Sequence, residues 1–210
     1  MDSPDGDVVL TAAAVMVSTL AERTDDDPAW AATAAPTAWS ALHAVDHVVD
    51  TLLFYAGQMA RRATRRYPVV RDGRSAPPGG LLDNATTAAH VLAAQLRDLG
   101  RARAWHPSGA ADAAGWAGMA VTEVLVHGSD AAQAHGIDLT LPEAVCERTV
   151  ARVFPWIDRG LAAPSTLLLA VTGRLHVDGV PDDPLWWWQS APLDEWDGRP
   201  RRRDVAPGWA

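Results

Sequence analysis

Glu123 and His127 lie four residues apart in a segment that is otherwise largely apolar. In a helix this spacing brings both side chains to one face, one turn apart, where they can share a metal ion. A carboxylate among apolar residues is costly to bury unless it is paired or coordinates an ion. An ordinary ion pair within one helix explains the same spacing, so the motif alone is a weak signal for a metal site.

His43 and His47 are also one turn apart, earlier in the chain. Either of them, together with Glu123 and His127, would supply three nitrogen and oxygen ligands. That number is typical of a catalytic metal site, which keeps a further position open for water or substrate. Two histidines and a carboxylate suit zinc, nickel and iron, and zinc is the first expectation. The alternative is a polar helix face with two solvated histidines.

Three further residues bear on the chemistry. Asp130 follows His127 by three residues and can either orient its imidazole or cap a surface. Arg174 can bind an anionic group of a substrate, although an exposed arginine is the commoner outcome. Cys146 is the only cysteine and is expected to be a small buried hydrophobe within a helix. A thiol nucleophile would therefore have to be brought in as a cosubstrate.

The composition excludes several classes of function. The net charge of −8 argues against a nucleic-acid partner, because phosphate binding needs clustered cations. The acidic N-terminus lacks the features of a signal peptide, and no apolar run is long enough to span a bilayer. A single cysteine excludes a disulfide framework, which fits a reducing cytoplasm. The chain contains no lysine, so Schiff-base chemistry is excluded as well.

The elements that must position these residues are predicted to be mostly helical. Apolar residues recur every three or four positions in five segments, which predicts helices over residues 8–23, 38–66, 81–99, 112–135 and 142–159. Four arginines close the second of these segments and are expected on its solvated end: Arg61, Arg62, Arg65 and Arg66. Short connections favour an antiparallel four-helix bundle with one extra helix.

The pattern of apolar and polar residues changes after residue 163. Residues 166–178 combine a short apolar run, a Thr-Gly turn and an alternating segment, which predicts a small β-hairpin. The tail that follows is rich in tryptophan: Trp186, Trp187, Trp188, Trp196 and Trp209. We expect a metal-binding helical bundle over residues 1–163 and a C-terminal extension over 164–210 that packs on it. A lid over the metal site or a dimer contact is the alternative for this tail.

Several of these motifs together resemble the DinB-like superfamily. The closest resemblance is to the metal-binding N-terminal domain of mycothiol-dependent maleylpyruvate isomerases. It is carried by the interval from Trp39 to His47, by the spacing of Glu123, His127 and Asp130, and by residues 168–174. In that family the metal-binding histidine follows the tryptophan by eight residues, which selects His47 over His43. The resemblance covers roughly residues 8–180.

The resemblance implies a DinB-like bundle, a divalent metal held by His47, Glu123 and His127, and a mycothiol-like thiol as cosubstrate. The implied activity is thiol transfer or thiol-assisted isomerisation of a small electrophile, by a transferase or an isomerase. The full isomerases carry a larger C-terminal domain than residues 164–210, which favours a transferase or a specialised descendant. The alternatives are another tailoring reaction in secondary metabolism and a non-catalytic, stress-associated metal-binding bundle. A homodimer is left open.

Overall fold

A computed structural model describes residues 3–25, 27–34, 38–68 and 76–205 of the chain. Within these ranges the protein is mostly α-helical, as predicted. The helices are α1 (Gly6–Ala21), α2 (Asp27–Ala31), α3 (Ala41–Ala60), α4 (Pro78–Leu99), α5 (Ala113–Ala134), α6 (Glu143–Val153) and α7 (Pro164–Val171). Two short strands, β1 (Thr33–Ala34) and β2 (Trp39–Ser40), pair antiparallel before α3, and a 3₁₀ turn (Leu193–Glu195) lies in the tail.

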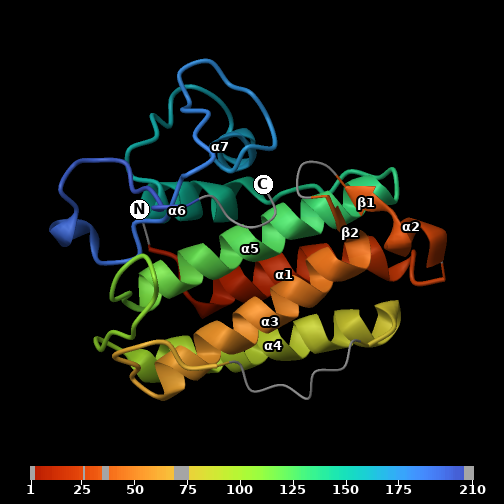
Figure 1. The fold of residues 1–210 in the computed structure, drawn as a ribbon, viewed down its shortest axis with the longest axis horizontal. Coiled ribbons are helices and arrows are strands. Elements are labelled where there is room, and N and C mark those ends of the chain that lie inside the picture. The colour runs from red at the N-terminus through yellow and green to blue at the C-terminus, as the bar shows by residue number, and fades with distance from the viewer. Residues whose placement is uncertain (1–2, 26, 35–37, 69–75, 206–210) are drawn as a thin grey trace.

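The four longest helices form a bundle in which α1 and α3 each contact both α4 and α5. Followed from the N- to the C-terminus in Figure 1, α1 and α5 run from left to right, whereas α3 and α4 run from right to left. Contacts at the helix ends agree: Gly6 at the start of α1 lies against Ala93 near the end of α4, and Arg62 after α3 pairs with Asp98. The neighbours α3 and α4 are therefore parallel, unlike the antiparallel neighbours that the sequence predicts.

Helix α5 lies at the centre of the molecule and carries two of the predicted metal ligands. Its N-cap is Asp112, whose carboxylate accepts a hydrogen bond from the Gly115 N–H group. Two glycines allow close packing of its neighbours. A Cβ at Gly118 would lie 2.6 Å from Val153 on α6, and one at Gly128 would lie 2.8 Å from Met16 on α1. Helix α5 is thus enclosed on several sides, which fixes the direction of its polar side chains.

Helix α3 is shorter than the 38–66 segment predicted from the sequence. Ser40 caps its start by accepting a hydrogen bond from the His43 N–H group. The helix ends at Ala60, and Arg62 adopts the left-handed conformation with φ of 47°. The arginine group therefore lies beyond the helix, where Arg61 and Arg65 approach the ring of Tyr67. Similarly, the helix predicted over 142–159 ends at Val153.

The predicted β-hairpin over residues 166–178 is wrong, because its first half is helix α7. Pro164 occupies the first turn of α7, where its missing N–H group is no loss. Leu167, Leu168 and Val171 are buried, and α7 packs on α6. A short apolar run bounded by turn residues suits a buried strand and a buried helix equally well, so periodicity could not separate them. Gly173, with φ of 79°, lies just beyond the end of the helix.

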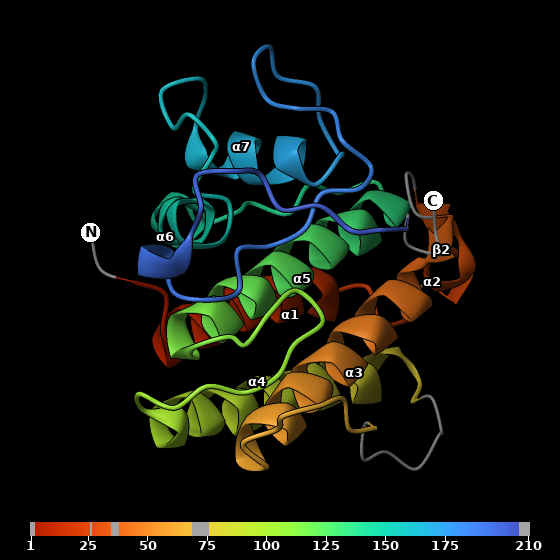
Figure 2. The same cartoon turned by 60° about the vertical axis from the view of Figure 1, so that its left-hand side comes forward.

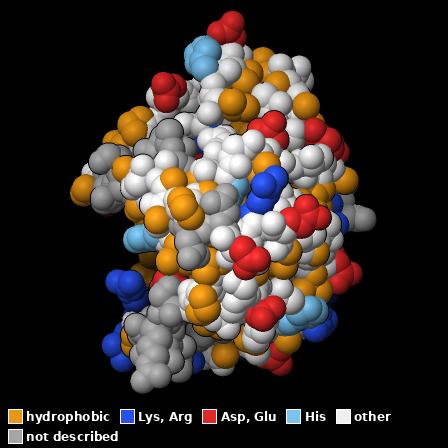
Figure 3. All heavy atoms as spheres, turned by 90° about the vertical axis from the view of Figure 1, so that its right-hand side faces the viewer, with side chains coloured by type: hydrophobic (Ala, Val, Ile, Leu, Met, Phe, Trp, Pro, Cys, Tyr) orange, Lys and Arg blue, Asp and Glu red, His pale blue; other side chains and the backbone are white. Residues whose placement is uncertain are grey.

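The tail after α7 runs back over α5 and α6 on one side of the bundle (Figure 2). Figure 3 shows another face of the molecule, where acidic, basic and apolar side chains are interspersed over the described surface. None of the helices in the described residues is long and apolar enough to cross a membrane.

Candidate metal centre

The structure brings His47, Glu123 and His127 together between α3 and α5. The Glu123 Oε2 atom lies 3.2 Å from the Nε2 atom of His47 and 3.2 Å from that of His127. One ligand atom from each residue falls within 4.8 Å of the other two, so this group could hold a metal ion. His43 is exposed, outside the group, with its ring stacked on Trp39 at a centroid distance of 4.5 Å. The geometry therefore agrees with the choice of His47 over His43.

The surroundings of His127 suit a metal-binding imidazole. Its Nδ1 atom lies 3.3 Å from Asp130 Oδ2, so a proton on Nδ1 can be donated to that carboxylate. Nε2, the atom that faces Glu123, can then offer its lone pair, as a metal ligand must. Burial lowers the pKa of His127, but hydrogen bonds and charges of Asp130 and Glu123 outweigh it, so the pKa is raised overall.

The carboxylate of Glu123 is held in its charged form by the same contacts. Burial raises the pKa of Glu123, but this effect is outweighed by hydrogen bonds from His127 and His47 and by their charges. The net result is a pKa well below the usual range of a glutamate. Two imidazole nitrogens and a carboxylate oxygen are a donor set that suits zinc, nickel and iron alike. The residues present therefore fit a divalent metal.

Asp130 is fully buried and links His127 to the end of α7. Arg174 donates to both of its oxygens, from Nε at 3.1 Å and from Nη2 at 2.7 Å, and a third bond from Nη1 reaches the Thr172 carbonyl. Of the two roles predicted for Asp130, the contacts support orientation of His127. The guanidinium of Arg174 is directed to Asp130, and its predicted binding of a substrate anion stays a prediction.

Two residues of α3 near the metal centre were missed by the sequence reasoning. The Thr51 hydroxyl lies 3.3 Å from His47 Nε2, and the Tyr55 hydroxyl donates to Glu123 Oε1 at 3.4 Å. They follow His47 by four and eight residues, so helical spacing from His47 could have identified both. Burial raises the pKa of Tyr55 well above its usual range, and the negative charge of Glu123 adds to this.

An aromatic cluster, defined here as Tyr55, His106, Trp116 and Trp188, lies beside the metal centre. The His106 ring contacts the other three rings at centroid distances between 5.3 and 5.8 Å. Its Nδ1 atom accepts a hydrogen bond from the Ser108 N–H group at 3.1 Å, which requires an unprotonated Nδ1. Burial lowers the pKa of His106 to about 3.

The tail covers the candidate metal centre. A cavity of about 20 Å³ beside Glu123 and His127 is bounded on the tail side by Trp186, Trp188 and Arg203. The guanidinium carbon of Arg203 lies 4.4 Å from the Trp187 ring centroid and 5.1 Å from that of Trp186. Sequence reasoning considered these tryptophans as a lid, but no local pattern pointed to Arg203.

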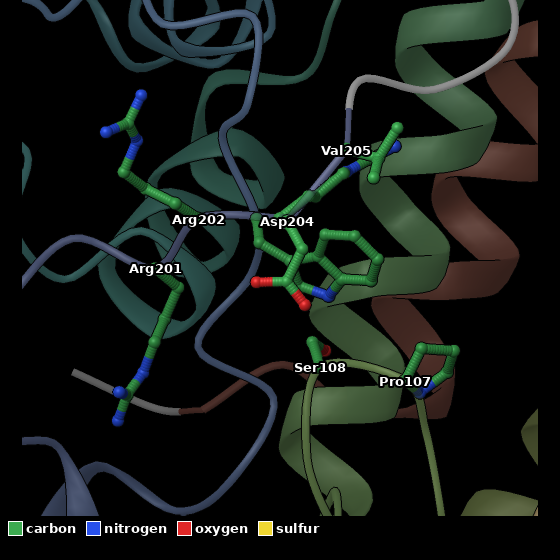
Figure 4. Close-up of a pocket in the computed structure, with 8 residues that line it drawn as sticks. Pro107, Ser108, Arg201, Arg202, Asp204 and Val205 are labelled. Carbon is green, nitrogen blue, oxygen red and sulfur yellow. The ribbon is translucent and has the colours of Figure 1, made fainter.

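A second, larger pocket of about 440 Å³ lies on the outer side of the same tail. Its wall includes Ser108, Trp187, Arg203 and Asp204. Figure 4 shows Ser108 and Asp204 near the centre of this pocket, while Arg201 and Arg202 extend to one side.

Comparison of the chain with protein-family models, with curated proteins and with solved structures found no significant match.

Proposed function

We propose that the protein is a DinB-like, divalent-metal-dependent enzyme that uses a low-molecular-weight thiol, such as mycothiol, for S-transfer or thiol-assisted isomerisation of a small electrophile. The observation that carries the proposal is the convergence of His47, Glu123 and His127 from two helices, with one ligand atom of each within 4.8 Å of the others. The motifs that resemble the mycothiol-dependent isomerases add the thiol and the class of reaction. Zinc is the expected metal, with nickel or iron as alternatives.

Each residue of the centre then has a distinct role. His47, Glu123 and His127 would hold the metal, which supplies Lewis acidity that lowers the pKa of a thiol or water toward neutrality. Asp130, held by Arg174, keeps the proton of His127 on Nδ1 and its Nε2 toward the centre. Such outer contacts commonly change metal affinity by about 10- to 100-fold when they are removed.

An external thiol is favoured because the chain offers no reactive thiol of its own at the centre. Cys146 lies on α6, is fully buried, and is absent from the residues that line the cavity. Burial raises the pKa of its thiol to about 12, and the charge of Glu143 adds to this effect. At neutral pH it is therefore a protonated, inert thiol. We place the protein in the cytoplasm, where a small thiol cosubstrate is kept reduced.

Metal content is the first test of this proposal. Elemental mass spectrometry of the purified protein should find about one divalent metal per chain, and His127→Ala should lose it because one of three ligands is gone. His43→Ala is the matched control, since His43 is one turn from His47 but outside the centre. Metal-free wild-type protein that cannot be loaded by added zinc, nickel or iron would overturn the metal-dependent function.

Thiol binding is the second test. In protein loaded with cobalt, addition of mycothiol should produce an intense near-ultraviolet absorption from a thiolate bound to cobalt. The same titration with the hydroxyl analogue of the thiol should not. A stoichiometric metal without any thiol response would overturn the thiol chemistry and favour a different tailoring reaction at the same centre.

A further inference from the structure

Residues 189–191 of the tail are bonded directly to helix α6. Arg152 on α6 is buried and donates to the carbonyls of Gln189 at 2.7 Å, of Ser190 at 3.1 Å and of Ala191 at 3.1 Å. The Gln189 N–H group donates to the Val153 carbonyl at the end of α6. This segment therefore ties the tail to the helices, and it separates two arms, residues 183–188 and residues 199–204.

The second arm is held by the first arm and by residues 189–191, since Arg201 Nε donates to Gln189 Oε1 at 2.7 Å. The Trp187 N–H group donates to the Arg201 carbonyl at 2.9 Å, and the Arg203 N–H group donates to the Leu185 carbonyl at 2.7 Å. Trp186 and Arg202 form an isolated antiparallel bridge, and Arg203 Nε donates to the Trp186 carbonyl. These bonds join one part of the tail to another, so breaking them would not require the helices of the bundle to separate.

Trp188, at the end of the first arm, is held by the core of the bundle. Trp188 is 5% exposed and belongs to the main hydrophobic core, in contact with the His106 ring. It would remain in place if the second arm moved. Arg203 is therefore the part of the cavity wall that lies on the second arm, whereas Trp186 and Trp188 lie on the first.

Arg203 lines both hollows, the inner cavity of about 20 Å³ and the outer pocket of about 440 Å³. A cavity needs roughly 10–15 Å³ to hold one water, so the inner one has room for little more than that. The outer pocket is within the range of sites for small molecules, which run from roughly 300 to 1,000 Å³. The outer pocket is thus large enough for a small molecule, whereas the inner cavity beside Glu123 and His127 is not.

We propose that Arg203 is a gate between the outer pocket and the metal centre. When the second arm separates from Trp186 and Trp187, the guanidinium leaves the cavity wall and the two hollows become one cleft that reaches Glu123 and His127. The purpose of the gate, admission of thiol and electrophile, rests on the proposed function. The gate itself is a property of the tail and does not require a bound metal.

Chemical labelling of His127 tests the gate directly. The full chain, as purified and after removal of metal by a chelator, is treated with diethyl pyrocarbonate, and labelled peptides are quantified by mass spectrometry. In the wild type we expect His127, whose side chain is 6% exposed, to react far more slowly than the exposed His43. If the open state is populated at about 10% or less, Arg203→Ala should raise the rate at His127 about tenfold after metal removal.

Arg199→Ala is the matched control, because Arg199 is exposed on the same arm and lines neither hollow. It should leave the labelling rate of His127 unchanged. Equal rates at His127 in the wild type and in Arg203→Ala would overturn the gate, even if the protein binds metal and thiol as proposed. Conversely, a protein without metal can still show the gated labelling, so the two proposals fail separately.

Hydrogen exchange of the wild type provides a test that needs no variant. The amides of Trp187 and Arg203, which join the two arms, should exchange faster than the amide of Gln189, which is bonded to Val153. Equal protection of all three amides would show that the tail opens only as a whole and would overturn a gate at Arg203.

Discussion

His127 and His106 are buried to the same extent, each with 5% exposure. Their pKa values nevertheless shift in opposite directions from the usual value of histidine. The pKa of His127 is raised, whereas that of His106 is lowered to about 3. Tyr55 links the two sites, because its ring contacts His106 while its hydroxyl donates to Glu123.

The difference comes from the partners and not from burial. The ring nitrogens of His127 face two carboxylates, Glu123 and Asp130, whose negative charges favour a cation between them. His106 is surrounded by the aromatic rings of the cluster and accepts a hydrogen bond on Nδ1. The region around His127 therefore carries negative charge and favours a cation, and is called the charged region below. The aromatic cluster around His106 disfavours a charge and is called the uncharged region.

Removal of a carboxylate from the charged region should have the largest effect. Asp130→Asn leaves the guanidinium of Arg174, whose side chain is 6% exposed, without its ionic partner. Breaking a buried ion pair in this way typically costs about 3–5 kcal/mol in the free energy of unfolding. Urea unfolding of the metal-free protein, followed by tryptophan fluorescence, measures this loss.

Asp98→Asn provides the control for this prediction, because Asp98 also pairs with an arginine, Arg62, but both side chains are largely exposed. It should change the free energy of unfolding by less than about 1 kcal/mol. Similar losses for the two variants would show that the Asp130–Arg174 pair is as well solvated as a surface pair, and the comparison of the two histidines would lose its basis.

The uncharged region should show itself in the pH dependence of stability. The pKa of His106 is lowered from 6.5 to about 3, so the unfolded chain binds a proton at this residue before the folded protein does. Its contribution to stability is therefore complete only well above pH 6.5 and is lost as the pH falls toward 3, by at most about 1.4 kcal/mol per pH unit. Because the unfolded histidine is already half protonated at pH 6.5, the loss from pH 6.5 to pH 5 amounts to about 1.6 kcal/mol.

His106→Asn should remove this part of the acid sensitivity, since Asn can still accept the Ser108 N–H bond but does not titrate. Urea unfolding at pH 6.5 and pH 5 measures the change, and exposed His90→Asn should leave the slope as it is in the wild type. A wild-type slope that survives in His106→Asn would mean that His106 is already solvated or protonated in the folded protein.

The charged region was the more predictable of the two from sequence. Glu123 and His127 follow from their four-residue spacing, and Asp130 from its place one turn further on. His47 could be chosen over His43 only through the interval from Trp39, because both histidines lie on the same helix one turn apart. Local spacing and a motif were sufficient there because the contacts repeat with the period of the helix.

The aromatic cluster and the gate could not be predicted because their contacts are long-range and irregular. Trp188 and Arg203 reach the centre from a tail without periodic structure. Both residues follow His127 by more than 60 positions in the chain. His106 lies in a loop, so no helical face showed its neighbours. The same limit explains the hairpin predicted over α7, where tertiary burial decided between two local structures of similar propensity.

Tyr55→Phe tests the link between the two regions and should have the smallest effect. The ring remains packed against His106 and Trp116, while the 3.4 Å hydrogen bond to Glu123 Oε1 is lost. Because this bond is long, we expect metal affinity to fall by about 10-fold at most, the lower end of the range for such outer contacts.

Competition with a chromophoric chelator measures the affinity, and Tyr67→Phe, away from the centre beside Arg61 and Arg65, serves as the control. An unchanged affinity in Tyr55→Phe would show that Glu123 is positioned by the two histidines alone, and that the aromatic cluster and the metal centre are neighbours without coupling.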